Sequence, residues 1–174
     1  KRFGFYYLVL QNILEIDDFS SITNIITDQD FNAKIFHISN QDEGIDAVYI
    51  DEERKNISLF NFKYRSKWNI DKEQSINETV ISSKYLNILQ TENNTLDGKL
   101  KVFTDLIIEK NQSDEVWNTT LYIVSNENKE LDKSNRELEN LRQVYGIETN
   151  CIGLDTLTQL MSLHPAPVST KIID

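Results

Sequence analysis

Hydrophobic residues recur at helical spacing in the first part of the chain. Residues 3–16 carry apolar side chains three or four positions apart, which predicts a helix. A second, short helix should follow, with Asp18 or Ser20 as its N-cap. The side chains expected in its core face are Phe19, Ile22 and Ile26. Residues 33–39 have no clear period, and we interpret them as a strand or an extended connection.

A β-hairpin is predicted next, from two apolar runs at residues 44–50 and 57–65. The charged segment "EERK", residues 52–55, separates the two runs and should form the turn. A turn at this place sets Ile50 opposite Ile57 and Asp46 opposite Asn61, and a register shifted by two residues would set Asp46 opposite Lys63 instead.

The second half of the chain alternates helical and strand patterns. Capping boxes at Ser75–Glu78 and Ser134–Glu137 predict the starts of two helices, the first over residues 76–90 and the second ending at Gly146. Asp97 and Asp155 are the predicted N-caps of two more helices. The inward face expected after Asp97 consists of Leu100, Phe103, Leu106 and Ile107, and that of the helix before Gly146 of Leu138, Leu141 and Tyr145.

Two further strands are predicted, at residues 119–125 and 148–154. The first is a continuous apolar run, which is typical of a strand covered on both faces. Because these strands alternate with helices, we expect an α/β fold with a mixed sheet: an antiparallel hairpin, later parallel strands, and flanking helices. A length of 174 residues fits one domain, residues 1–174. Since the first residue is Lys1 and not Met, we expect this domain to be part of a longer protein.

Composition narrows the function classes. The net charge of −10 disfavours nucleic-acid binding over the whole surface, but "KYRSKW", residues 63–68, is locally basic with two aromatic residues. A solvated strand exit would explain the same run. The single cysteine, Cys151, excludes an intrachain disulfide and fits a reducing cytoplasm. The apolar opening, about ten residues long, is too short to span a bilayer.

Three polar residues of the hairpin call for an explanation. In the predicted register Asp46, Asn61 and Lys63 converge on one face at the open end of the hairpin. One interpretation is a salt bridge between Asp46 and Lys63 at an exposed sheet end. The other is a divalent-cation site, in which carboxylate and amide oxygens hold Mg²⁺ or Mn²⁺ beside a lysine that stabilises charge on a phosphate.

The stretch "DEGIDAVYIDEERKNISLFNFKYR" resembles the N-terminal nuclease region of abortive infection phage resistance proteins, within the PD-(D/E)XK restriction-endonuclease-like superfamily. That region has a Gly-Ile-Asp strand, an acidic turn and a strand that ends Gln-x-Lys-Tyr. The later segments "TLYIVSN", "VYG" and "TNCIGLD" fit the same layout. The resemblance implies a restriction-endonuclease-like core at the N-terminus of a longer phage-defence protein.

The resemblance also implies roles for individual residues. Asp46 would be the central metal ligand, and Lys63 would orient the attacking water. Asn61 stands where the family has an acidic or Gln ligand, so weaker metal binding is expected. The carbonyl of Phe62 would complete the coordination. Glu15 is the candidate for the glutamate that related nucleases add from the first helix, and a solvent-facing helix residue is the alternative interpretation of it.

Taken together, the sequence predicts a Mg²⁺-dependent nuclease domain that cuts DNA or RNA. Backbone contacts are expected from Arg65 and Lys67, and base stacking from Trp68. The other expected partners are a second copy of the chain, in a homodimer, and further domains of the same longer chain. No contact with a membrane is expected. The alternative is a catalytically inactive nuclease-like fold that serves as a binding or assembly module.

Overall fold

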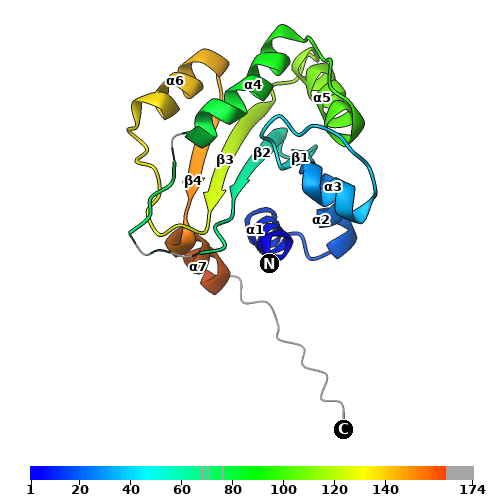
Figure 1. The fold of residues 1–174 in the computed structure, drawn as a ribbon. Helices are drawn as coiled ribbons and strands as arrows, with labels where there is room; N and C mark the ends of the chain where they lie inside the picture. Colours follow the sequence, from blue (N-terminus) through cyan, green and yellow to red (C-terminus); the bar gives the residue numbers. More distant parts are fainter. Residues whose placement is uncertain (68, 70, 76, 164–174) are drawn as a thin grey trace.

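A computed structural model describes residues 1–67, 69, 71–75 and 77–163 (Figure 1). Seven helices and four strands lie in these ranges. The predicted α/β class is confirmed: a mixed sheet, made of an antiparallel hairpin followed by parallel strands, has helices on both sides. In the part of the chain that is described, no helix has the length and apolar character needed to cross a membrane.

The sheet has the spatial order β1-β2-β3-β4. Its strands are β1 (Ala47–Asp51), β2 (Asn56–Lys63), β3 (Asn118–Ser125) and β4 (Glu148–Ile152). β1 pairs with β2 antiparallel, and the two later pairings are parallel. The carboxyl ends of β2, β3 and β4 therefore share one edge of the sheet with the amino end of β1. Ligands of α/β proteins commonly bind at such carboxyl ends.

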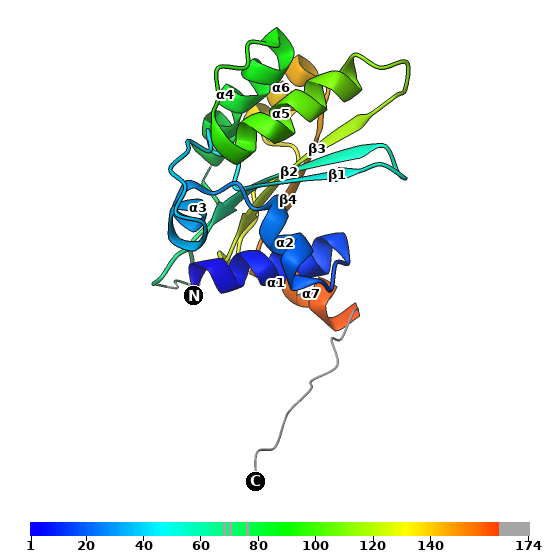
Figure 2. The ribbon, with the colours of Figure 1, turned by 90° about the vertical axis from the view of Figure 1, so that its right-hand side faces the viewer.

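Helices cover the sheet in two layers (Figure 2). One layer contains α4 (Asn77–Thr91), α5 (Gly98–Asn111) and α6 (Arg136–Tyr145). The other contains α1 (Arg2–Leu14), α2 (Phe19–Ile25) and α7 (Leu154–Leu163), with α3 (Gln29–Ile35) beside the start of β1. Side chains alternate along β2 between two cores, since Ile57 and Leu59 pack under α4–α6 while Phe60 and Phe62 pack against α1.

Aromatic rings join α1 to the sheet. Tyr6 stacks on Phe62 with ring centroids 4.5 Å apart, and Phe60 stacks on Tyr122 of β3 at 4.7 Å. Offset stacking of this kind adds about 0.5–1.5 kcal/mol beyond the burial of apolar area. These contacts fix α1 over the end of β2.

The predictions for the N-terminal helices are confirmed in part. Asp18 caps α2 by accepting a hydrogen bond from the Ser21 amide at 2.6 Å, and Ile22 is buried. Phe19 was expected in the core, which is wrong: it is 67% exposed and stacks on the ring of Tyr7. Because Tyr7 lies on the half-buried side of α1, that ring shields Phe19 without enclosing it.

Residues 33–39 do not form a strand. Residues up to Ile35 belong to α3, whose N-cap is Asp28 and whose Phe31 is buried at 1% exposure. The cap and this single core contact hold a helix of seven residues, which is too short for a periodic pattern to show in the sequence.

The later elements lie within a few residues of their predicted positions. Ser75 accepts a hydrogen bond from the Asn77 amide at the start of α4, while the side chain of Glu78 is outside what the structure describes. Asp97 precedes α5 as predicted, but its side chain makes no capping hydrogen bond. On α5, Leu100 and Ile107 are buried, but Leu106 is 39% exposed. The buried face of the helix is therefore narrower than the predicted one.

Two predicted caps are displaced, by one residue in α6 and by two in α7. Asn135, rather than Ser134, caps α6 by accepting from the Glu137 amide at 2.9 Å. Asp155 lies in the first turn of α7, which begins at Leu154, so it does not occupy the cap position. Gly146 ends α6 with a φ of 64°, as predicted for a left-handed C-cap.

Candidate metal centre

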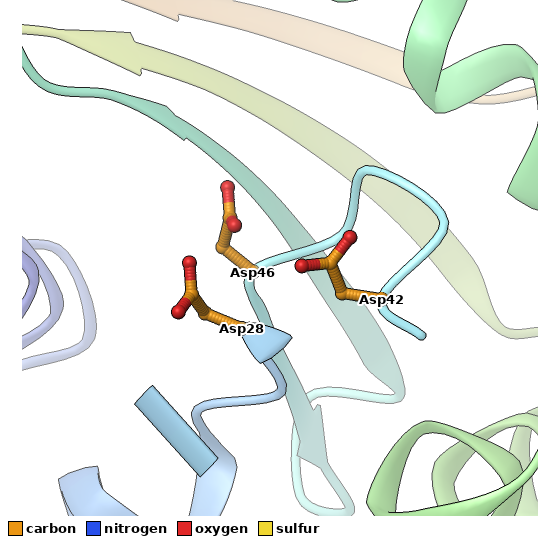
Figure 3. A group of neighbouring side chains, drawn as sticks. All are labelled: Asp28, Asp42 and Asp46. Atoms are coloured by element: carbon orange, nitrogen blue, oxygen red, sulfur yellow. The ribbon is translucent and has the colours of Figure 1, made fainter. Parts of the chain in front are cut away.

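Three carboxylates meet at the edge of the sheet where β1 begins. Asp28, Asp42 and Asp46 each offer one oxygen, and these oxygens lie within 4.8 Å of one another (Figure 3). The three residues come from the N-cap of α3, from the loop after α3, and from the position directly before β1. Carboxylate oxygens at this spacing are hard ligands of the kind that Mg²⁺, Mn²⁺ and Ca²⁺ prefer.

Asp46 reaches this group because of a β-bulge. Its amide donates to the Phe60 carbonyl at 2.8 Å, although the ladder already pairs Phe60 with Ala47. Two residues of one strand thus face a single residue of the other, which is the definition of a bulge. In agreement, Ile45 and Val48 both pack in the core under α4–α6, so strict alternation is broken between them.

The bulge places the Asp46 carboxylate against the backbone of β2. Its Oδ2 accepts a hydrogen bond from the Phe62 amide at 2.6 Å, in a position where only 9% of Asp46 is exposed. The Asp46 carbonyl accepts from the amides of Thr27 and Asp28 at 2.8 and 3.0 Å. One residue therefore connects the segment before α3 to β2.

Asp28 has three partners besides the acidic group. It caps α3 by accepting from the Phe31 amide at 2.6 Å, and it accepts from the Tyr6 hydroxyl at 3.0 Å. Arg2 also donates to it at 3.1 Å, but the same guanidinium nitrogen lies 3.0 Å from Asp30. The positive charge of Arg2 is divided between two carboxylates, so it offsets only part of the negative charge of the group.

Asp42 is held by two backbone amides. It accepts from Gln29 and from Gly44, each at 3.0 Å. The second bond is an Asx-type turn that bends the loop toward β1. These bonds fix the Asp42 side chain beside the other two without adding a cation.

The electrostatics of the group favour a bound proton or cation. Burial raises the pKa of Asp46 well above its ordinary range, and the charges of Asp28 and Asp42 raise it further, against the lowering effect of the Phe62 hydrogen bond. Burial, with the charges of Asp46 and Asp28, also raises the pKa of the Tyr6 hydroxyl. A divalent cation among the three carboxylates would relieve this repulsion.

Asn61 lies on the other face of β2 from the acidic group. Its Nδ2 donates to the Gly44 carbonyl at 2.9 Å and to Ser82 Oγ of α4 at 3.0 Å, and Asn61 is 3% exposed. The predicted register is confirmed from Asp51–Asn56 to Ala47–Phe60, but the bulge ends it before Asp46. The structure therefore does not set Asp46 and Asn61 side by side on one face.

Lys63 and Phe62 complete the end of β2. Lys63 is half-buried and pairs with Ser125 of β3, and strand alternation puts it on the Asn61 face. The amide of Phe62 points to Asp46. Since the N–H and C=O of one ladder residue point to the same neighbour, the Phe62 carbonyl also faces the edge that Asp46 occupies.

Glu15, the glutamate expected from the first helix, and Glu43, in the loop before β1, lie elsewhere. Glu15 is exposed and ends α1, nine residues beyond Tyr6, which corresponds to about 13 Å along a helix. Glu43 has a φ of 46° and lines a hollow with Ile88 and Asp97 on the α4–α5 side. Neither belongs to the group of three carboxylates.

The residues predicted to bind nucleic acid follow β2 directly. Arg65 and Lys67 are exposed and line a common pocket. Trp68, the predicted stacking residue, lies outside the described residues.

Sequence reasoning missed Asp28 and Asp42. A local signal exists for each: Asp28 precedes a helix, and Asp42 precedes Glu-Gly in a turn. Nothing in the sequence, however, shows that the residue before α3 is hydrogen-bonded to residue 46.

Comparisons of this chain with protein-family models, with curated proteins and with solved structures found no match.

Proposed function

We propose that this chain is a metal-dependent nuclease domain of a phage-defence protein of the abortive infection type, hydrolysing phosphodiester bonds of DNA or RNA. The observation that carries the proposal is the group of three carboxylates beside the end of β2, the strand that ends in Lys63. The resemblance of the hairpin sequence to PD-(D/E)XK nucleases supports the same class of reaction.

The ligand set that we propose differs from the one the resemblance implies. Asp28, Asp42 and Asp46 would hold Mg²⁺ or Mn²⁺, and the Phe62 carbonyl faces the same edge. Asn61 lies on the opposite face of β2 from these carboxylates and its Nδ2 donates to Gly44 and Ser82, so it is assigned a structural role. When bound, such a cation polarises the phosphate and lowers the pKa of a bound water.

The chain's own residues supply positioning. Hydrogen bonds from the Phe62, Phe31 and Gln29 amides orient the three carboxylates before any ligand arrives. Lys63 lies on the opposite face of β2 from the acidic group, but it is the last residue of the strand. Its flexible four-carbon stem would extend past the strand end to neutralise charge that develops on the phosphate. Carboxylates that are already held in place lose little conformational entropy when a cation binds, which favours affinity.

A second candidate function is a binding module without catalysis. The specific observation in its favour is that Asn61, at the position of a family ligand, lies on the opposite face of β2 from the acidic group and donates its Nδ2 to Gly44 and Ser82. The net charge of −10 points the same way, because it opposes the approach of a polyanion.

Cleavage of labelled single-stranded and double-stranded DNA and RNA in Mn²⁺ or Mg²⁺ tests the proposal. Asp46→Asn and Lys63→Met should each lower the rate at least about 100-fold, which is typical of losing one charge-stabilising group. Asp105→Asn is the matched control, because Asp105 is exposed on α5 and paired with Lys101. Metal-induced stabilisation without cleavage of any substrate would contradict the nuclease and favour the binding module.

A further inference from the structure

A second polar site lies at the carboxyl edge of the sheet, apart from the acidic group. A pocket of about 180 Å³ opens where the chain leaves β2 and β3. Its lining residues are Arg65, Lys67, Asn69, Lys72, Asn126 and Glu127. The two strands are parallel neighbours, so the pocket has the position at which α/β proteins commonly bind anionic ligands.

Positive charge is concentrated in this pocket, although the chain has 28 acidic and 18 basic residues. Three of the six lining residues are cations. Arg65 forms an ion pair with Glu127 at 3.2 Å, and within the described ranges no ion pair involves Lys67 or Lys72. Counting Glu127, the lining carries a formal charge of +2, which suits a phosphate.

Arg65 is held in place rather than mobile. Asn126 clamps its backbone by accepting from the Arg65 amide at 2.7 Å and donating to its carbonyl at 2.9 Å. Glu127 is anchored as well, because its carbonyl accepts from the Leu154 amide at the start of α7 at 3.0 Å. A cation and a carboxylate are thus presented together at fixed positions.

One carboxylate oxygen of Glu127, Oε2, accepts no hydrogen bond from the described residues. The residue is 3% exposed, its Oε1 accepts from Arg65, and no donor among the described residues reaches its Oε2. A buried carboxylate oxygen without a donor is costly, by roughly 1–3 kcal/mol or more. A ligand with a hydrogen-bond donor next to its phosphate would satisfy it.

We infer that this pocket binds a ribose phosphate unit, with the phosphate on Arg65, Lys67 and Lys72 and a sugar hydroxyl donating to Glu127. A phosphodiester offers no donor at neutral pH, and the sugar of an internal DNA nucleotide has no hydroxyl. The 2′-hydroxyl of RNA is a donor, and it is the group by which proteins distinguish RNA from DNA. Because Oε2 is buried, side chains that line the pocket must move before a hydroxyl can reach it.

The ligand can be a unit of an RNA strand or a free ribonucleotide. Arg65 is three residues beyond Phe62, so the two Cα atoms are at most about 11 Å apart. A strand held in the pocket would therefore pass near the acidic group. The assignment of RNA as the substrate of the nuclease rests on the proposed function, whereas binding to the pocket does not.

Binding of labelled RNA and DNA oligonucleotides of one sequence, measured in EDTA by fluorescence anisotropy, tests the inference. RNA should bind roughly tenfold more tightly than DNA, as one hydrogen bond to a charged group allows. Calorimetry with adenosine monophosphate and its 2′-deoxy form distinguishes the two sources of the ligand. Binding of adenosine monophosphate as tight as that of the RNA oligonucleotide assigns the pocket to a free nucleotide, and binding of the oligonucleotide alone assigns it to a strand.

Variants separate the two parts of the pocket. Glu127→Gln keeps an oxygen for Arg65; it should reduce the preference for RNA to near one without weakening DNA binding. Lys72→Gln should weaken both nucleic acids about equally and lower the slope of log affinity against log salt by about 1. Lys101→Gln, on α5 outside the pocket, should change neither.

The outcomes bear on this site alone. Equal binding of RNA and DNA that Glu127→Gln does not alter, or affinity that is unchanged in Lys72→Gln, overturns the inference. Binding in EDTA that persists in Asp46→Asn supports the pocket even if no cleavage is ever found. Metal-dependent cleavage with no RNA preference leaves the proposed nuclease intact and removes the pocket's role.

Discussion

Asp46 combines a structural and a chemical role at the candidate metal centre. Its backbone carbonyl binds the segment before α3 to the hairpin. Its side chain accepts the hydrogen bond of the Phe62 amide, in the place of a backbone carbonyl of β1. The carboxylate is buried beside two others and near the Tyr6 hydroxyl. Such a group is stable as an anion only when a cation is near, so its ionisation should be measurable in the stability of the protein.

The first residue-scale prediction concerns pH. The pKa of Asp46 in the folded protein lies above the unfolded value of about 3.9, so folding is favoured when Asp46 is protonated. Stability from this group is complete below the unfolded pKa and is lost as pH rises through the folded pKa. Asp46→Asn, which cannot ionise, should therefore melt at a higher temperature than wild type at pH 8 in EDTA.

The difference in melting temperature between Asp46→Asn and wild type should depend on pH, and this dependence is the internal control. At pH 5 the difference should shrink, because the wild-type carboxyl takes up its proton. Thermal melts followed by circular dichroism at both pH values measure it. A variant that is less stable than wild type by the same amount at pH 5 and pH 8 would contradict a raised pKa.

Residue-scale sequence reasoning found Asp46 but not its surroundings. The run "GID" before alternating apolar residues marks an acid at the start of a strand. The bulge that turns Asp46 away from Asn61 depends on hydrogen bonds to Phe60, Thr27 and Asp28, which no local pattern encodes. Alternation alone predicted the wrong neighbour for that reason.

At the scale of elements, two glycines with positive φ have different functions. Gly146 ends α6 with φ 64°, and a Cβ there would meet nothing within 4 Å. Gly44 lies in the loop before β1 with φ 76°, and a Cβ there would collide with Ile81 of α4. The carbonyl of Gly44 also accepts from Asn61, so the loop that carries Asp42 is packed closely on α4 and β2.

Alanine substitution should separate these cases. Gly146→Ala should cost about 1 kcal/mol from backbone conformation alone, while Gly44→Ala should cost about 3 kcal/mol because overpacking is added. Gly4→Ala, at an open helical position of α1, should stabilise by about 0.5–1 kcal/mol. Urea unfolding gives all three values, and equal costs at Gly44 and Gly146 would contradict the close packing of the loop.

Elements with strong local signals were predicted well. The hairpin, β3 and the C-cap at Gly146 follow from alternation, a long apolar run and a glycine at a helix end. Helix α3 was missed because seven residues give less than two full periods. The shift of the α6 cap from Ser134 to Asn135 reflects two adjacent residues that both cap well.

At the scale of the whole molecule, charges of opposite sign gather at one edge of the sheet. The acidic group lies before β1 and the basic pocket follows β2 and β3, on a chain whose net charge is −10. This separation suits a ligand that is anionic and that also engages a cation, as a phosphodiester does. Sheet topology produces it, because an antiparallel β1 brings its start to the carboxyl edge of its neighbours.

The central claim is that Asp28, Asp42 and Asp46 together hold one divalent cation. Titration of the metal-free protein with Mn²⁺, followed by electron paramagnetic resonance of the free ion, tests it most directly. The account predicts one bound Mn²⁺ per chain in wild type and in Asp105→Asn, and loss of that binding in folded Asp46→Asn. Free Mn²⁺ that stays equal to the amount added up to millimolar concentration, or binding that Asp46→Asn leaves unchanged, would contradict the claim.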